Sequence, residues 1–169
     1  RKVHLQQFFA KQYVLHAPLW GNSNFYGVGV LVRGGRLSVK FVDYSEGVHF
    51  LVVNFRQDFM LAHVYISPRK LEEVAGLLAH FEAEFSRYRR VIITGDFNCT
   101  PSLAGFADLV DRPTFRISAW SDFVTQPDHV FVTDALTHCI SNLRYFDPLR
   151  GGHRMVMFDL KMKSLSNYL

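Results

Sequence analysis

The most informative segment of the sequence reads Val91-Ile92-Ile93-Thr94-Gly95-Asp96-Phe97-Asn98. Its first four residues are apolar or β-branched, which predicts a short strand buried in the middle of a sheet. Gly95 ends this run, and an acid and an amide follow it. Because side chains alternate along a strand, Asp96 and Asn98 are expected on one side while Phe97 points into the core. The segment therefore predicts a polar pair at the rim of a sheet.

This polar pair allows two interpretations. A carboxylate and an amide at a strand end can hold a hard cation, or can position a water molecule or a phosphate group. Asp-x-Asn after a glycine is also ordinary turn chemistry, because both side chains hydrogen-bond to nearby backbone groups. On the spacing of Asp96 and Asn98 alone, the turn is the favoured interpretation.

Upstream of this segment, the sequence predicts an antiparallel meander. Runs rich in Val, Phe, Ile and Tyr cover residues 27–33, 37–44, 49–56 and 59–67. Gly34-Gly35 separates the first two runs and predicts a hairpin, since both glycines tolerate positive φ angles. The polar pair Gln57-Asp58 predicts the turn between the last two runs.

A long amphipathic helix is predicted over residues 68–90. Ser67 and Pro68 suit the N-cap and the first turn, and the arginines near residue 90 suit the C-terminal end of the helix dipole. Apolar residues recur at steps of three and four: Leu71, Val74, Leu77, Leu78, Phe81, Phe85 and Tyr88. This spacing places them on one face of the helix.

The remaining pattern predicts a short helix over residues 102–110 and strands over 113–117, 129–133, 140–145 and 153–162.

The 169 residues are 49% hydrophobic and 15% aromatic, which is ample for one buried core and excludes disorder as the main state. No stretch approaches the roughly 18 apolar residues of a membrane span. The sequence therefore predicts one compact, strand-rich α/β domain over residues 1–169.

Charge and cysteine content bear on the partner and the compartment. The 19 Lys and Arg against 15 Asp and Glu give a net charge of +4, which permits contact with phosphate-rich partners without requiring it. Cys99 and Cys139 lie far apart in the sequence, and we interpret them as reduced thiols of an intracellular protein. A disulfide between them is the alternative. The opening residues lack the apolar core of a secretory signal.

Three further side chains are suited to catalysis. Asp128 precedes the apolar run 129–133, and His153 follows Gly151-Gly152 at the start of the last predicted strand. A histidine at such a point can act as general acid or base, with Asp128 fixing its tautomer. Tyr65 lies near the end of a predicted strand, just before the helix. Taken singly, such a histidine is more often structural, and such a tyrosine more often packs in the core.

Taken together and in order, these motifs resemble the endonuclease/exonuclease/phosphatase superfamily with the DNase I-like fold. The order is a tyrosine and a proline at a strand end, an amphipathic helix, an apolar strand into Gly-Asp-Phe-Asn, an Asp-His-Val-Phe strand and a histidine before the last strand. The resemblance covers residues 27–162 and includes the Gly-Val strand found in endonuclease domains of non-LTR retrotransposons. It implies an α/β fold, a β-sandwich of two packed, mostly antiparallel sheets flanked by helices and N-terminally short.

The resemblance also implies a role for each matched side chain. Asp96 would contact the attacking water and a metal ion, and Asn98 would orient that water or the scissile phosphate. His153 would bind a phosphate oxygen or move a proton, with Asp128 as its orienting carboxylate. Tyr65 would contact the phosphate. The implied cofactor is Mg²⁺ or Mn²⁺, which together with the histidine would neutralise a pentavalent phosphorane.

The sequence departs from the family pattern at both ends. The family's final motif is Ser-Asp-His, whereas Gly152 precedes His153 here. The family also begins with an Asn-bearing strand and a strand ending in Gln-Glu, whose Glu is the principal metal ligand. If Leu5-Gln6-Gln7 is the remnant of that second strand, Gln7 occupies the metal position, and a neutral amide would lose most of the attraction for Mg²⁺. Either upstream sequence was removed or the chain is a degenerate member of the family.

The implied function is a metal-dependent phosphodiesterase that hydrolyses nucleic acid as an endonuclease does, provided that the missing N-terminal motifs are supplied. DNA is favoured over RNA as the partner, and the nucleus is expected as the compartment if this is a eukaryotic DNA endonuclease. Two alternatives stay open. One is a catalytically degenerate DNase I-like module that binds nucleic acid or protein partners, and the other is a phosphatase of lipid or sugar phosphates.

Overall fold

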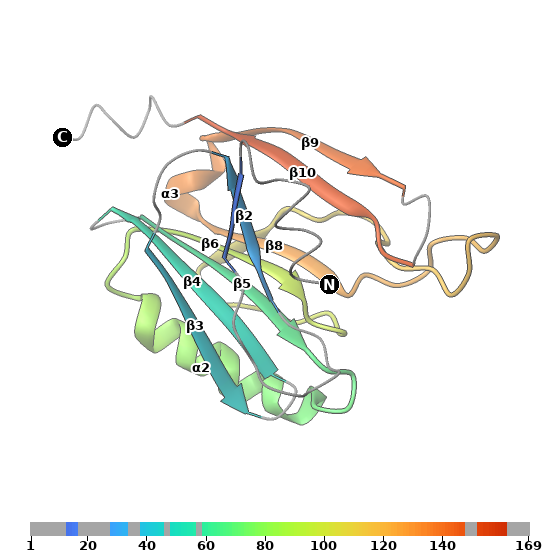
Figure 1. Ribbon diagram of the computed structural model, residues 1–169, viewed down its shortest axis with the longest axis horizontal. Helices are drawn as coiled ribbons and strands as arrows, with labels where there is room; N and C mark the ends of the chain where they lie inside the picture. The colour runs from blue at the N-terminus through green and yellow to red at the C-terminus, as the bar shows by residue number, and fades with distance from the viewer. Residues whose placement is uncertain are drawn as a thin grey trace.

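A six-stranded sheet forms the centre of the protein (Figure 1). The computed structural model describes residues 13–16, 28–33, 38–45, 48–56, 59–147 and 152–161. The strands follow the order β3-β4-β5-β6-β8-β7 across the sheet. Their bounds are β3 (Ser38–Ser45), β4 (Val48–Arg56), β5 (Phe59–Ile66), β6 (Arg90–Asp96), β7 (Phe106–Asp108) and β8 (Asp128–Thr133). Adjacent strands run antiparallel except β5 and β6, which are parallel because a helical crossover joins them.

Helix α2 (Val74–Phe85) covers one face of this sheet and is preceded by a single 3₁₀ turn, η1 (Leu71–Glu73) (Figure 1). The side chains of α2 that are buried are those of Val74, Leu77, Phe81 and Phe85. The Phe81 ring meets Phe50 of β4 edge-on at a centroid distance of 5.1 Å. The predicted apolar face of the helix is therefore the face that packs on the sheet.

Two ribbons of two strands each cover the opposite face (Figure 1). One pairs β1 (Tyr13–His16) with β2 (Val30–Arg33), and the other pairs β9 (Ile140–Phe146) with β10 (Met155–Leu160), both antiparallel. A short helix, α3 (Asp134–Thr137), links β8 to β9. Val156, Phe158 and Leu160 of β10 pack against the apolar cluster that contains Ile92, Val130 and Val132. The predicted α/β fold with two packed, mostly antiparallel strand layers is confirmed.

One predicted pairing is wrong. The sequence suggested a hairpin through Gly34-Gly35, but β2 pairs with β1 and β3 pairs with β4, in separate sheets. Gly34-Gly35 and Gln57-Asp58 lie outside the described residues. The reason for the error is that a glycine pair signals only a local reversal, whereas the partner of a strand depends on the layer in which it is buried. Val28 and Val30 pack with Val53, Leu61 and Tyr65 on the ribbon side of the sheet.

The long helix is shorter at both ends than predicted. Ser67 and Pro68 do not begin it; the amide of Lys70 donates to the Ser67 carbonyl at 2.8 Å and closes a turn ahead of η1. At the other end α2 stops at Phe85, and Arg90 is the first residue of β6. Arg90 is only 7% exposed and pairs in register with Phe59, so the extended ladder replaces the last predicted helical turn.

The predictions after β6 are partly correct. The strands predicted at 91–94, 129–133 and 140–145 are confirmed as β6, β8 and β9. The helix predicted over 102–110 is wrong, because Phe106–Asp108 forms β7 and pairs with the edge of β8. The strand predicted at 113–117 is reduced to isolated bridges from Phe115 to Thr125 and to His153, and β10 begins at Met155.

Among the described residues, no helix is long and apolar enough to span a membrane. Cys99 and Cys139 are free thiols, so the disulfide left open by the sequence is not formed between them.

Candidate active site

The candidate active site is a cavity of about 520 Å³ between the six-stranded sheet and the strands of the second layer. Its polar wall comes from the ends of β5, β6 and β8 and from the segment that enters β10. Its apolar wall includes Val28 before β2 and Val156 and Phe158 of β10. A cavity with one polar and one apolar wall, at the ends of central strands, is a common form of ligand site.

Asp96 and Asp128 meet in this cavity because the sheet register places them opposite each other. They are the last antiparallel pair of the β6–β8 ladder, and both line the cavity. Each side chain is about four-fifths buried, with 21% of Asp96 and 20% of Asp128 exposed. Phe97, the next residue, is fully buried with the α2 cluster on the other face, as predicted.

His153 joins the two carboxylates. Its Nδ1 donates to Oδ2 of Asp128 at 2.9 Å, and its Nε2 lies 3.9 Å from Oδ2 of Asp96. The backbone of His153 bridges to Phe115, whose ring packs against the imidazole at a centroid distance of 4.8 Å. The imidazole is therefore held by a carboxylate and an aromatic ring while its Nε2 is directed toward Asp96.

The charges of this trio alter the proton affinities of Asp96 and His153. Burial raises the pKa of Asp96, and the charge of Asp128 adds to this, while the Asn98 amide and the two nearby histidines oppose it. The hydrogen bond that His153 donates to Asp128 raises the pKa of His153, and the charges of Asp128 and Asp96 add to this, against the opposing effect of partial burial. The site thus favours an imidazolium beside two carboxylates.

Asn98 contacts Asp96 through its backbone rather than through its amide side chain. Its backbone N–H donates to Oδ1 of Asp96 at 3.0 Å, and its Nδ2 donates to the carbonyl of Ile66 at 2.7 Å. The expectation that strand alternation continues through Asn98 is wrong, because β6 ends at Asp96 and Asn98 turns with a φ of 52°. Asp96 therefore fits both interpretations of the motif, because it accepts a hydrogen bond within the turn and its carboxylate also faces His153.

Of the other residues that the sequence analysis singled out, Tyr65 lies at the site, Gln7 is not described and Gly152 is closely packed. Tyr65 is the register partner of Asp96 across β5 and β6, and it lines the same cavity. Gln7 lies outside the described residues. Gly152, where the resemblance to the family led us to expect an aspartate, is tightly packed: a Cβ there would lie 2.5 Å from the Arg116 carbonyl oxygen and 2.5 Å from the Phe115 ring.

Sequence reasoning missed His63. It lines the cavity from β5, and its Nδ1 is hydrogen-bonded to Oγ1 of Thr94 at 2.9 Å. Burial lowers the pKa of His63, and the charge of Asp128 offsets this only in part. The signal was available, because His63 is two residues before Tyr65 on the same strand and alternation places the two side chains on one face.

Asp96, Asp128 and His153 also form a group that can hold a metal ion. One ligand atom from each lies within 4.8 Å of the others. Two carboxylate oxygens and one imidazole nitrogen are suitable donors for Mn²⁺, and the carboxylates suit Mg²⁺.

A loop with exposed apolar side chains lies beside this group. This 116–124 loop connects the bridge partners Phe115 and Thr125, and the connection from β7 to β8 that contains it projects beyond the ends of β9 and β10 (Figure 1). Trp120 is 97% exposed, Ile117 86% and Val124 63%. The guanidinium groups of Arg116 and Arg154 lie 4.7 and 3.7 Å from the Phe123 ring centroid.

Comparison with known proteins identifies the family. A model of the endonuclease/exonuclease/phosphatase family matches residues 4–145. The chain belongs to this family. Its members are nucleases and phosphatases that hydrolyse phosphoester bonds, and activity of this type is what membership supports for the chain. No curated protein matches the sequence.

Solved structures of several DNA-processing enzymes are similar in fold to this chain. The endonuclease domain of TRAS1, a telomere-specific non-LTR retrotransposon, is 17% identical with a TM-score of 0.62, over 88% of this chain and 80% of that one. The 3'-5' exonuclease NExo from Neisseria meningitidis is 15% identical with a TM-score of 0.68, over 92% and 82%. NExo from Neisseria is also described as a 3' phosphatase bound to product DNA hairpin, at 16% identity and a TM-score of 0.66, over 94% and 82%.

Proposed function

We propose that this protein is a divalent-metal-dependent phosphodiesterase that cleaves nucleic acid internally. The observation that carries the proposal is the row of side chains in which His153 lies between Asp128 and Asp96, on the polar wall of the cavity. Hydrolysis of a phosphodiester needs a group that activates water and a proton donor for the phosphate or the leaving oxygen, and this row offers both.

Each side chain has a distinct role in this proposal. Asp128 accepts a hydrogen bond from the Nδ1–H of His153 and so leaves Nε2 directed at the reacting phosphate. Because its pKa is raised, His153 retains a proton on Nε2 that it can donate to a phosphate oxygen. Asp96 accepts a hydrogen bond from the attacking water and orients it. Tyr65, on the adjacent strand, donates a hydrogen bond from its hydroxyl to the phosphate.

The side chains that would hold the metal in this proposal are the carboxylates of Asp96 and Asp128, two members of the group that can hold an ion. His153 would face the phosphate instead, because it carries a proton on each ring nitrogen. When bound, Mg²⁺ or Mn²⁺ supplies positive charge to the phosphate oxygens. The protein's own contribution is to gather two carboxylates by strand register and to keep them away from bulk water, which strengthens their interaction with a cation. Gln7 remains a proposed neighbour of this site.

Nucleic acid is the substrate that the surroundings of the site favour. The 116–124 loop offers the nearly fully exposed ring of Trp120 and, beside Phe123, the guanidinium of Arg116. Arg154, which also lies over the Phe123 ring, comes from the segment before β10 and is paired with Asp147. Aromatic rings stack on bases of any sequence, and arginines pair with phosphates. We favour DNA over RNA because the structural neighbour from Neisseria was solved with a product DNA hairpin.

A non-catalytic binding module is the second candidate, and Gly152 favours it. The close packing of Gly152 against Phe115 and Arg116 leaves no space for the aspartate that the family carries there. A site without that carboxylate would bind a cation less tightly. In this case the fold would keep its nucleic-acid contacts without turnover.

A substrate panel tests these proposals. The protein is incubated with supercoiled plasmid, circular single-stranded DNA, a 3'-phosphorylated oligonucleotide, an RNA of the same sequence and an inositol phosphate, each with Mg²⁺, Mn²⁺ or EDTA. We expect metal-dependent cleavage of the circular DNAs, which have no ends for an exonuclease. Release of phosphate from the inositol phosphate alone would favour a phosphatase, and binding of DNA without any cleavage would favour the non-catalytic module.

A further inference from the structure

His129 is a buried histidine with a hydrogen-bond partner on each ring nitrogen. Its side chain is 1% exposed, on the face of β8 opposite Asp128. Nδ1 lies 2.7 Å from Oδ2 of Asp108, and Nε2 lies 2.9 Å from the carbonyl oxygen of Cys99. A carbonyl and a carboxylate only accept hydrogen bonds, so both ring nitrogens act as donors. His129 thus connects β8 with β7 on one side and with the turn after β6 on the other.

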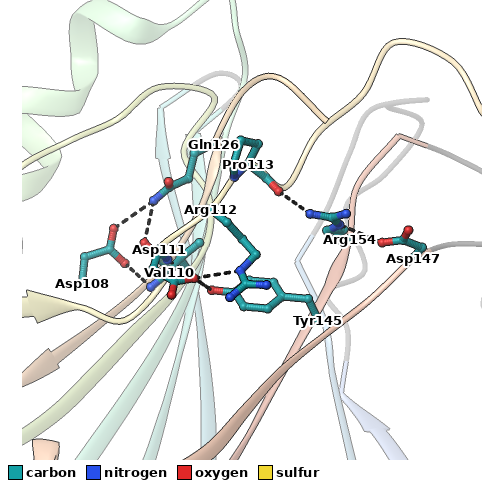
Figure 2. Close-up of polar contacts among 9 residues, drawn as sticks. All are labelled: Asp108, Val110, Asp111, Arg112, Pro113, Gln126, Tyr145, Asp147 and Arg154. Carbon is teal, nitrogen blue, oxygen red and sulfur yellow. Dashed lines mark hydrogen bonds and ion pairs between the residues drawn. The ribbon is translucent and has the colours of Figure 1, made fainter. Parts of the chain in front are cut away.

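The carboxylate of Asp108, which bonds to His129, is itself held by several hydrogen bonds. Its Oδ1 accepts the backbone amides of Val110 and Val130 at 3.1 and 3.3 Å. Its Oδ2, besides His129, lies 3.4 Å from Nε2 of Gln126, which also donates to the Val110 carbonyl (Figure 2). Asp108 is therefore held by backbone groups of two segments, and the imidazole is oriented against a carboxylate that has little freedom to move.

The other end of the connection reaches the candidate active site. Cys99, whose carbonyl accepts from His129, follows Asn98 in the turn. Asn98 has a positive φ of 52°, a left-handed conformation that asparagine adopts more readily than most non-glycine residues and that suits a tight turn. Its N–H donates to Asp96. Movement of the Cys99 peptide would rotate this N–H away from the carboxylate that faces His153.

We propose that His129 is a positioning residue of the active site, which acts by holding the Cys99 carbonyl so that the Asn98 N–H stays aimed at the Asp96 carboxylate. The catalytic part of this inference rests on the proposed function. The geometric part does not, because it concerns the turn itself. The ring nitrogens of His129 bond to Asp108 and Cys99 and not to Asp96, Asp128 or His153. Apart from its charge, which lowers the pKa of Asp96 and is removed equally by any neutral substitution, its effect is therefore transmitted through the backbone of residues 98 and 99.

Two substitutions separate the contacts of His129. In His129→Gln the amide nitrogen can reach the position of Nε2 and keep the bond to Cys99, whereas in His129→Asn it can reach the position of Nδ1 and keep only the bond to Asp108. Both variants remove the ring, its packing and any charge. Their difference therefore reports which of the two hydrogen bonds matters. Val132→Ala, a core truncation on the same strand, matches them for general loss of stability.

Two measurements are made on the full chain: the rate of plasmid nicking with Mn²⁺ as the metal, and hydrogen exchange of the Asn98 amide. For His129→Asn we expect a kcat about 10-fold lower than for His129→Gln, with KM changed much less, because a misplaced Asp96 affects the reacting geometry rather than substrate binding. We also expect exchange of the Asn98 amide to be about 10-fold faster in His129→Asn than in His129→Gln. Val132→Ala should alter neither quantity beyond its loss of stability.

Equal kcat and equal exchange in the two variants, or a greater loss in His129→Gln, would overturn the inference. If the wild-type chain nicks nothing, the proposed function fails, and the exchange measurement still decides the positioning role. If His129→Asn does not fold, His129→Gln is compared with the wild type. Protection of the Asn98 amide that stays within about 3-fold of the wild type supports the inference, and complete loss of that protection in folded protein overturns it.

Discussion

Nδ1 of His153 and Oδ2 of Asp128 lie 2.9 Å apart, although 25 residues separate them in the sequence. Asp128 begins a central strand, and His153 precedes a strand of the second layer. The hydrogen bond between them therefore crosses from one layer of the sandwich to the other. The layers must be packed before the site exists, which links folding of the domain directly to its proposed chemistry.

This relationship predicts the titration of His153. Because the hydrogen bond donated to Asp128 raises the pKa of His153 above the ordinary 6.5, His153 should titrate above that value in the wild type. In Asp128→Asn the raising contribution is lost while partial burial remains, so the pKa should fall. Imidazole resonances followed by NMR across pH 5 to about 9 check this. An unchanged pKa in Asp128→Asn would show that the contact does not form in solution.

The raised pKa of His153 also predicts how the free energy of unfolding changes with pH. A group whose pKa is raised by folding contributes stability that is fully present below its unfolded value, 6.5 for His153, and is lost as the pH rises through the folded pKa. The wild type should therefore exceed His153→Gln in free energy of unfolding most at acid pH, and the difference should shrink above neutrality. Urea unfolding at several pH values measures it. A difference that grows with rising pH would contradict the assignment.

Gly95 is predicted to be intolerant of substitution. It has a φ of +149°, and an added Cβ would lie 2.0 Å from the carbonyl oxygen of Val64 on the adjacent strand. Gly95→Ala should cost about 3 kcal/mol or more, because both the backbone and the β5–β6 ladder must shift. Gly105→Ala is the control, since Gly105 also has a positive φ, +76°, but nothing lies within 4 Å of its Cβ. Equal losses in the two variants, measured by urea unfolding, would refute the steric explanation.

Restoring the family residue at Gly152 should not improve the site. Gly152→Asp brings a side chain against the Arg116 carbonyl and the Phe115 ring, the same ring that packs on His153. We expect a loss of about 1–3 kcal/mol in stability and no gain in Mn²⁺ affinity. Thermal unfolding and metal titration by calorimetry provide the two readouts. Tighter Mn²⁺ binding in a stable Gly152→Asp variant would show that the segment adapts to the carboxylate.

Trp120 should contribute to binding and not to stability. Its side chain is 97% exposed, so Trp120→Ala should leave the free energy of unfolding within about 0.5 kcal/mol of the wild type. Loss of one stacked base should weaken DNA binding by about 1–3 kcal/mol. Fluorescence anisotropy with a labelled oligonucleotide measures the affinity, and Trp120→Phe, which keeps a ring, should retain much of it. Unchanged affinity in Trp120→Ala would remove the loop from the substrate site.

The sequence predicted the central elements because their signals are local and strong. The apolar runs before Gly95 and over residues 129–133 each predict a strand that is buried on both faces, so β6 and β8 were predicted correctly. The site trio followed, since Asp96 and Asp128 stand at the ends of these strands. The order of the motifs then gave His153 as the third member.

The errors have a different origin, namely contacts between distant residues. The helix predicted over 102–110 contains the helix-compatible residues of β7, but pairing with β8 and the bonds of the Asp108 carboxylate override that preference. The side chain of Asn98 was misplaced because a single positive φ redirects it to Ile66. His129 was noticed only as part of a motif, since its partners Asp108 and Cys99 lie 21 and 30 residues away.

The central claim is that Asp96 and His153 form a metal-dependent hydrolytic site, and plasmid nicking by matched variants tests it most directly. The wild type, Asp96→Ala, His153→Ala and the surface control Asp159→Ala are compared at equal folded concentration with Mn²⁺ and with EDTA. We predict that the wild type and Asp159→Ala nick the plasmid and that EDTA abolishes this nicking. In Asp96→Ala and His153→Ala the rate should fall by a factor of about 100 or more. Nicking by Asp96→Ala and His153→Ala at the wild-type rate would contradict the account.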